Sequence, residues 1–376
     1  MPHPSQAQRT TVQRAEGQRT RARSGRVRPG LRTLSLGAAL VLSAATVSAC
    51  SGSSDASLPT PDQPDITVGV TTSLGDVPFL MGMATTNTPG AGSFTKAGLS
   101  VTVQTFPTET AEMAALSNGS IDIAYGEYGQ FFASNDPLAS SGQLKILSAG
   151  YDATAGSIMM LVPRGSATPD YTAIQDGSPG ASIAVPSATG PEYLALAAYL
   201  NSIGSPISSN IGMGGSGGQN DDIKIIADPT VEITAAVTHQ VSAIVLQEPY
   251  ATQAQEQDGL VPEVDLASGD STAVPLDGYF ASSTFIQKHP TTAEDFTAVM
   301  TQLQALGTSR TVIEAALRAA QTTPSHAYSD SIATMQLGTY PTTTIPAKIS
   351  IVGQLMDDAG TISSPLDVTT IVNTAS

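Results

Sequence analysis

Polar and aromatic side chains gather in five short segments that each follow a predicted strand or begin a predicted helix. These segments are residues 71–73, 107–110, 126–128, 187–190 and 247–250. Their hydroxyl and amide groups can bind a polar group, and aromatic rings there can stack on a flat solute. For each ring, ordinary packing in the core is the alternative. The candidate ligand-binding residues are Thr71, Thr72, Ser73, Phe79, Thr108, Glu109, Gly126, Glu127, Tyr128, Ser187, Thr189, Gly190, Tyr193, Glu248 and Tyr250.

Carboxylates are frequent in these segments, at Glu109, Glu127, Glu192 and Glu248. A carboxylate enclosed in a cleft needs a partner, so several of them indicate a ligand that carries a positive charge or N–H donors. For Glu109 and Glu192 we prefer another interpretation, in which they occupy the first turns of helices and interact with the helix dipole. For Glu248 a purely structural role is the alternative to ligand binding.

Catalytic and metal chemistry receive little support. Outside the first 49 residues only His239, His289 and His326 are present, and none has a second histidine or cysteine at metal-ligand spacing. The glycine-rich segment 212–218 matches dinucleotide-binding and nucleophile-elbow patterns, but no strand precedes it and no helix follows, which indicates a flexible loop. We therefore expect no catalytic residue, no metal and no cofactor.

Short apolar runs alternate with helical patterns from residue 66 onward, which is typical of an α/β fold. A second set of the same units begins near residue 181 and suggests two lobes. We expect strands at 66–70, 99–104, 121–125, 144–148, 157–162, 182–185, 223–226 and 241–246, and helices at 108–118, 191–203, 231–237, 291–306, 312–320 and 347–359.

The first 50 residues have the layout of a bacterial lipoprotein signal peptide. Arginines precede an uncharged apolar stretch that ends in Ser48 and Ala49, directly before Cys50, the only cysteine in the chain. We expect cleavage before Cys50, acyl chains such as palmitate on the new N-terminus, and a flexible linker over residues 50–65. The protein would then be exported and anchored to the outer face of the cytoplasmic membrane. A free thiol in an exported protein is the alternative.

The charge of the chain limits its partners. Residues 50–376 hold eight basic and 31 acidic residues. Such a chain repels nucleic acid and anionic lipid headgroups. The low basic content also disfavours nitrate or sulfonate, although backbone amides at helix starts can bind anions. We favour a neutral or cationic, partly aromatic organic solute such as a pyrimidine, with a sulfonate as the alternative.

Three segments together resemble the nitrate/sulfonate/taurine and thiamin-precursor (SsuA/THI5-like) binding proteins of ABC importers. They are residues 116–126 (LSNGSIDIAYG), 183–194 (IAVPSATGPEYL) and 239–251 (HQVSAIVLQEPYA), and the resemblance extends over about residues 66–360. The third segment departs from the pattern in having Gln240 and Val241 where glycine usually precedes an acidic residue. The resemblance implies an α/β, two-lobed type II periplasmic-binding-protein fold, each lobe a mixed sheet flanked by helices, with the ligand cleft between the lobes.

We expect lobe 1 to comprise residues 66–155 and 276–376 and lobe 2 residues 156–275, with hinge crossovers near 150–157 and 275–279. The expected function is capture of a small solute by a monomer, closure of the lobes, and delivery to an ABC permease without catalysis. The alternatives are a THI5-like, pyrimidine-related enzyme and a surface lipoprotein that senses a ligand without transport. Replacing Tyr128 or Tyr193 by alanine is expected to weaken binding without unfolding the protein.

Overall fold

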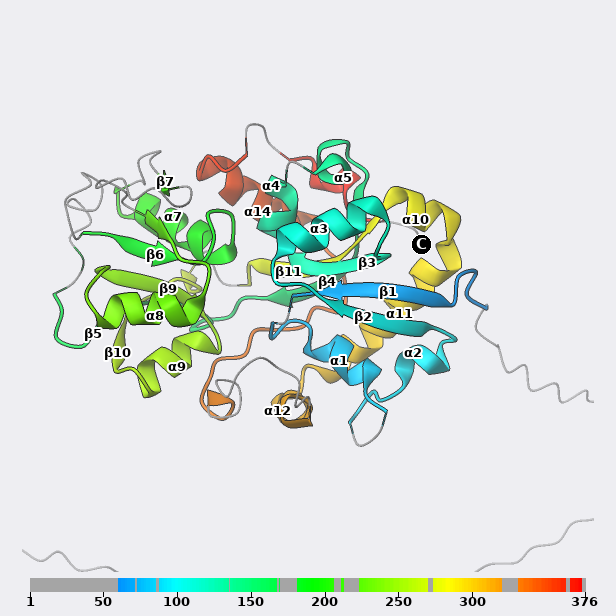
Figure 1. Cartoon of the computed structure of the whole chain (residues 1–376), viewed down its shortest axis with the longest axis horizontal. Coiled ribbons are helices and arrows are strands. Elements are labelled where there is room, and N and C mark those ends of the chain that lie inside the picture. The colour runs from blue at the N-terminus through cyan, green and yellow to red at the C-terminus, as the bar shows by residue number, and fades with distance from the viewer. Residues whose placement is uncertain are drawn as a thin grey trace, which may run out of the picture. The chain divides into compact units, whose positions relative to one another are not determined.

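The computed structural model describes residues 60–71, 73–85, 88–134, 136–167, 169, 181–205, 211–212, 223–269, 273–319, 331–362 and 366–373, all within the compact unit Ala56–Ser376. Their strands form two mixed sheets flanked by helices (Figure 1). Cys50, Thr72 and most of the glycine-rich segment lie outside the described residues. Within the described part, none of the helices has both the length and the apolar character needed to cross a bilayer.

Sheet A has the strand order β2-β1-β3-β11-β4. Strand β1 pairs in parallel with β2 and β3, whereas β11 pairs antiparallel with β3 and β4. Almost all of β11 is buried, because it lies between β3 and β4 and helices α4 and α14 pack on it. The strands are β1 Asp65–Val70, β2 Ser100–Thr105, β3 Ile123–Glu127, β4 Leu144–Asp152 and β11 Pro275–Ser282.

Sheet B has the strand order β10-β5-β9-β6-β8-β7. Strands β6, β7, β8 and β9 pair in parallel, while β5 is antiparallel to both β9 and β10. The interior strands are rich in fully buried Ile, Val, Leu and Ala, as expected for strands covered on both faces. The strands are β5 Ile158–Pro163, β6 Ile183–Val185, β7 Ile211–Gly212, β8 Ile223–Ile225, β9 Ala243–Gln247 and β10 Leu260–Asp265.

Capping residues fix where the longer helices begin and end. The Thr108 side chain accepts a hydrogen bond from the Ala111 amide at 3.2 Å, and Gly119 ends the same helix at φ 76°. The helices are α1 Val77–Met83, α2 Ser93–Lys96, α3 Glu109–Asn118, α4 Tyr128–Ala133, α5 Pro137–Ser140, α7 Pro191–Ser202, α8 Pro229–Val237, α9 Tyr250–Glu256, α10 Ser283–Lys288, α11 Pro290–Leu306, α12 Arg310–Ala319 and α14 Pro346–Asp358, with the 3-10 helix η2 at Val368–Thr370.

Both sheets contain the same helix–strand unit, displaced by 120 residues along the chain. In the first unit the buried Glu112 of α3 accepts a hydrogen bond from the Tyr125 amide at 2.9 Å. In the second unit the buried Glu232 of α8 accepts one from the Val245 amide at 3.3 Å. His239, at φ 56°, stands where the first unit has Gly119. The residue with left-handed backbone geometry in the second unit is therefore His239. It lies directly before Gln240 and Val241, the positions at which the sequence pattern of the family led us to expect a glycine.

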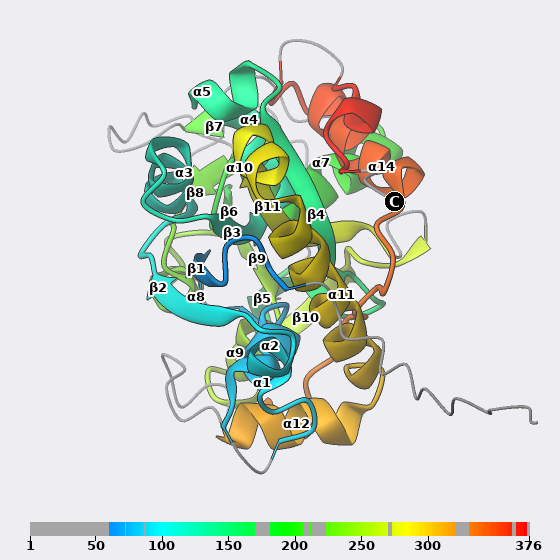
Figure 2. The ribbon, with the colours of Figure 1, turned by 90° about the vertical axis from the view of Figure 1, so that its right-hand side faces the viewer.

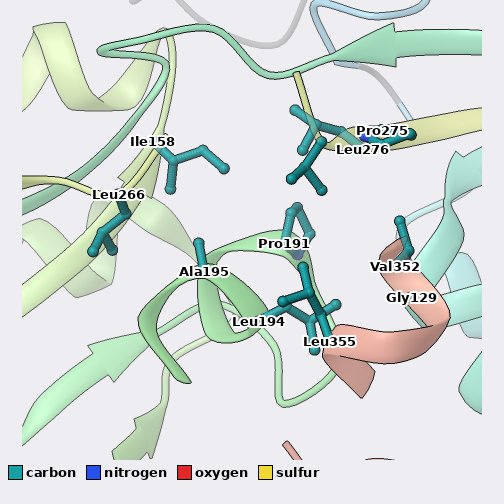
Figure 3. A pocket seen from close by; sticks show the side chains of 11 residues that line it. Gly129, Ile158, Pro191, Leu194, Ala195, Leu266, Pro275, Leu276, Val352 and Leu355 are labelled. Atoms are coloured by element: carbon teal, nitrogen blue, oxygen red, sulfur yellow. The ribbon is translucent and has the colours of Figure 1, made fainter. Parts of the chain in front are cut away.

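The chain passes between the sheets twice. It leaves sheet A after Asp152, enters sheet B at Ile158, and returns at Pro275. Residues 275–279, which the sequence placed at a crossover, form the first part of β11 instead. The C-terminal helix α14 packs against α4 and α7 (Figure 2). The apolar cavity at this junction, of about 20 Å³ (Figure 3), is too small for an organic solute.

Two carboxyl groups are buried next to the helices that flank sheet A. Asp76, directly before α1, is 1% exposed, and Glu112 is fully buried. Burial raises the pKa of each group to about 8, because the surroundings cannot solvate the charged form as water does. Both groups are therefore protonated in the folded protein under mildly acidic conditions.

We expect the protein to be less stable at pH 8 than at pH 5. In this range the unfolded chain has already released protons that folded Asp76 and Glu112 retain, so the free energy of unfolding falls as pH rises, by about 1.4 kcal/mol per pH unit for each group. Urea unfolding at both pH values measures the effect. Asp76→Asn should remove the contribution of Asp76 and leave that of Glu112, because an amide does not titrate. Equal stability at the two pH values would contradict the expectation.

Candidate functional site

A cleft of about 740 Å³ lies where strand ends and helix starts of the two sheets face each other. Its walls include the residues after β1, β3, β6 and β9 and the first turns of α3 and α7. The carboxyl ends of parallel strands are the usual ligand-binding edge of open α/β sheets. The predicted site residues that line this cleft are Thr71, Ser73, Thr108, Glu109, Gly126, Glu127, Ser187, Thr189, Glu248 and Tyr250.

Three glutamates and one glutamine form a connected group in the cleft. On the sheet A side, Glu109 accepts a hydrogen bond from the Glu127 amide at 2.9 Å. On the sheet B side, the amide nitrogen of Gln247 donates to Glu192 at 2.8 Å and to Glu127 at 3.4 Å. Gln247 therefore joins carboxylates from the two walls of the cleft. The sequence interpretation that Glu192 only serves its helix did not include this contact.

The electrostatics of this group are unusual because the carboxylates face one another. Enclosure in the cleft raises the pKa of Glu109 and Glu127 well above the ordinary value, and like charge raises each further: Glu127 acts on Glu109, and Glu192 acts on Glu127. Enclosure also raises the pKa of Glu192. Among the described residues that line the cleft there is no lysine, arginine or histidine to offset these charges.

Asp277 of β11 lies at the end of the cleft nearest sheet A and was not predicted from the sequence. Its side chain is only 6% exposed, and the Tyr125 hydroxyl hydrogen-bonds to the carboxylate. The second oxygen, Oδ1, has no hydrogen-bond partner in the described part of the protein. A Cβ atom at Gly75 or Gly150 would lie 2.8 Å or 2.5 Å from Oδ1. Glycine at these two positions thus leaves room for the carboxylate.

Glu248 also lines the cleft, but its own chain satisfies it. Oε2 accepts a hydrogen bond from the Thr252 amide at 3.0 Å, and Oε1 accepts from the Thr252 hydroxyl at 2.8 Å and the Gln336 amide at 3.0 Å. These contacts hold the start of α9 against residues near the crossover. The geometry supports the structural interpretation of Glu248.

Three predicted aromatic residues, Phe79, Tyr128 and Tyr193, do not line the cleft. All three side chains are almost completely buried in the apolar core. Their positions do not favour the sequence expectation that these rings stack on a ligand, because each ring is packed in the core and none lines the cleft. Gly190 precedes α7, and a Cβ there would lie 3.0 Å from Glu127 Oε2, so the small residue keeps space beside the carboxylates.

Among the described residues, histidine, cysteine, aspartate and glutamate form no group of three or more that could hold a metal ion. The described residues that line the cleft also include no histidine that could activate one of its serine or threonine hydroxyls. What the cleft offers chemically is a set of hydrogen-bond acceptors with a few amide donors. Such a surface can bind a polar solute.

The sequence profile of the NMT1-like family matches residues 60–321. No curated protein matches the chain. Among solved structures, the periplasmic aliphatic sulphonate binding protein SsuA from Escherichia coli has a TM-score of 0.61 and 15% identity, covering 82% of this chain and 97% of that one. The periplasmic nitrate-binding protein NrtA from Synechocystis PCC 6803 has a TM-score of 0.62 and 11% identity, covering 84% and 87%.

The ligand binding component of an ABC-type import system from Staphylococcus aureus, solved with zinc bound, has a TM-score of 0.60 and 12% identity, covering 83% of this chain and 97% of that one. These similarities, with the two mixed sheets, confirm the predicted periplasmic-binding-protein fold. Since the family profile spans most of the residues, the chain belongs to the NMT1-like family.

Proposed function

We propose that this protein is an exported, lipid-anchored solute-binding protein that captures a small organic solute for an ABC importer. The observation that carries the proposal is the cleft of about 740 Å³, in which Gln247 from sheet B approaches Glu127 from sheet A at 3.4 Å. A solute between such walls contacts both sheets at once, so its binding energy favours the closed arrangement.

The proposal has three parts that extend the family assignment. Lobe 1 comprises residues 66–155 and 276–376 and lobe 2 comprises residues 156–275, with the crossovers as the hinge. The predicted residues that line the cleft, apart from Glu248, bind the solute. Acyl chains on Cys50 hold the protein at the outer face of the cytoplasmic membrane. The predicted linker 50–65 is shortened at its end, because Asp62 and Gln63 hydrogen-bond to Thr292 and Asp65 begins β1. Similar proteins are named for aliphatic sulphonates and nitrate; for this cleft we favour a neutral or cationic organic solute.

A thermal-shift screen of sulfonates, pyrimidines, flavins and amines tests solute binding. A ligand at about 100 times its Kd adds roughly 2.7 kcal/mol to the free energy of unfolding, which corresponds to a rise in Tm of roughly 5 °C or more for a protein of this size. The bound compound should be recovered unchanged after incubation. Recovery of a converted product would favour the enzyme alternative, and no stabilisation by any class would contradict solute capture.

A further inference from the structure

The lining of the cleft has many more acceptors than donors. Glu109, Glu127, Glu192 and Asp277 all contribute carboxylates, and the described lining residues include no cationic side chain. Ionised carboxylates that are shielded from water need hydrogen bonds or an opposite charge. The donors that face this group, chiefly Gln130 at 3.1 Å from Glu127 and Gln247, are already engaged.

Two carboxylate oxygens in the cleft remain without a partner in the described structure. They are Asp277 Oδ1, on a side chain that is 94% buried, and Glu109 Oε2. Most buried acceptors in folded proteins have a partner, so each exception calls for an explanation, and a donor from a water, an ion or another molecule is one. Because Asp277 lines the cleft, that donor can come from a bound solute.

The helix starts in the cleft do not favour an anion. Glu109 is the first residue of α3, and Glu192 lies in the first turn of α7. The partial positive charge of each helix N-terminus is therefore offset by a carboxylate of the same helix. A sulfonate or nitrate would have to approach these carboxylates without a side-chain cation to compensate.

We infer that the cleft selects an organic cation with N–H donors, which binds between Glu127 on the sheet A side and Glu192 on the sheet B side while reaching Asp277 and Glu109. This inference rests on the proposed solute-binding function and names its solute class. Each wall alone has like charges in proximity, and a cation between the walls supplies the opposite charge that both lack. Amidinium and guanidinium groups fit best, since their planar N–H pairs match carboxylates.

Isothermal titration calorimetry with agmatine, benzamidine, tetramethylammonium, ethanesulfonate, zinc chloride and a neutral aminopyrimidine tests the inference. We expect agmatine or benzamidine to bind and tetramethylammonium, a cation without N–H donors, to bind at least roughly tenfold more weakly. Glu127→Gln and Glu192→Gln should each weaken binding roughly tenfold or more. The control is Glu294→Gln, which removes an exposed carboxylate of α11 outside the cleft and should leave Kd within about twofold. Circular dichroism checks that each variant is folded.

The outcomes separate the two proposals. Binding of ethanesulfonate or the aminopyrimidine without binding of agmatine or benzamidine overturns the cation inference and leaves solute capture standing. Zinc binding without organic cations also overturns it, as does cation binding that is equally strong in Glu127→Gln and Glu192→Gln. If none of the probes binds, the cation inference fails. Solute capture fails as well only if the wider thermal-shift screen also shows no stabilisation.

Discussion

Replacing Gly129 by alanine should weaken solute binding by roughly tenfold or more while leaving the protein folded. Gly129 belongs to α4 on the sheet A side, and a Cβ atom there would lie 2.1 Å from the Thr189 carbonyl oxygen in the segment after β6. This neighbour is backbone and cannot rotate away, so the segment must move and the walls of the cleft must separate. Tenfold corresponds to about 1.4 kcal/mol, a modest loss for displaced contacts on one wall. Calorimetry with a solute from the screen measures it.

A second helical glycine provides the control for this substitution. Gly353 lies in α14, and a Cβ there would meet its nearest neighbour, Leu366 Cβ, at 3.4 Å, an ordinary contact. Gly353→Ala should keep the affinity and raise stability by up to about 1 kcal/mol, since alanine is the better helix former. If Gly129→Ala binds the solute as tightly as Gly353→Ala does, the contact between α4 and Thr189 does not limit closure.

Replacing Tyr128 by alanine should cost about 3–5 kcal/mol of stability, as is usual when a large buried aromatic side chain is removed. The ring is completely buried and lies 5.6 Å from the ring of Phe280 and 5.7 Å from that of Phe132. Urea unfolding measures the loss. This expected loss of stability differs from the expectation drawn from the sequence, which was that Tyr128→Ala weakens binding without unfolding the protein.

Tyr128→Phe separates the ring from its hydroxyl. The hydroxyl is buried and has no hydrogen-bond partner in the part of the chain that the structure describes. Because an unsatisfied buried hydroxyl is unfavourable, the free energy of unfolding of the phenylalanine variant should be equal to that of the parent protein or up to about 1 kcal/mol higher. A stable Tyr128→Ala variant with reduced affinity would restore the original assignment of Tyr128 to the binding site.

Much of the fold could be predicted because its signals are local. Short apolar runs located β1, β5 and β8, and the helix predicted at 108–118 agrees with α3 to within one residue. Strand β3 was placed two residues early, since Ile121 and Ile123 on either side of the polar Asp122 resemble the alternation of a strand. Strand β11 was missed because it begins at a proline and contains Asp277, and because its partners in β3 and β4 are more than 120 residues away in sequence. Pairing at that distance leaves no local pattern.

The residues of the candidate site likewise fall into those that local sequence signals located and those that they did not. The rule that ligands bind at the ends of strands located Thr71, Glu127 and Ser187 at the cleft, because it needs only the strand boundaries. The side to which each aromatic ring points depends on tertiary packing, which the sequence does not show. Tyr128 and Tyr193 were therefore assigned to the ligand only because they lie close to strand ends and helix starts. Asp277 had one signal that was not used, a single acidic residue in the apolar run from Leu276 to Phe280.

The unit repeated in the two sheets ends its strand in a carboxylate at Glu127 but in an amide at Gln247. Two copies of one ancestral scaffold would present identical faces, whereas these present different ones. A molecule held between them is consequently oriented, with one fixed end toward each face. Under the proposed function, every solute molecule would then reach the permease in the same orientation.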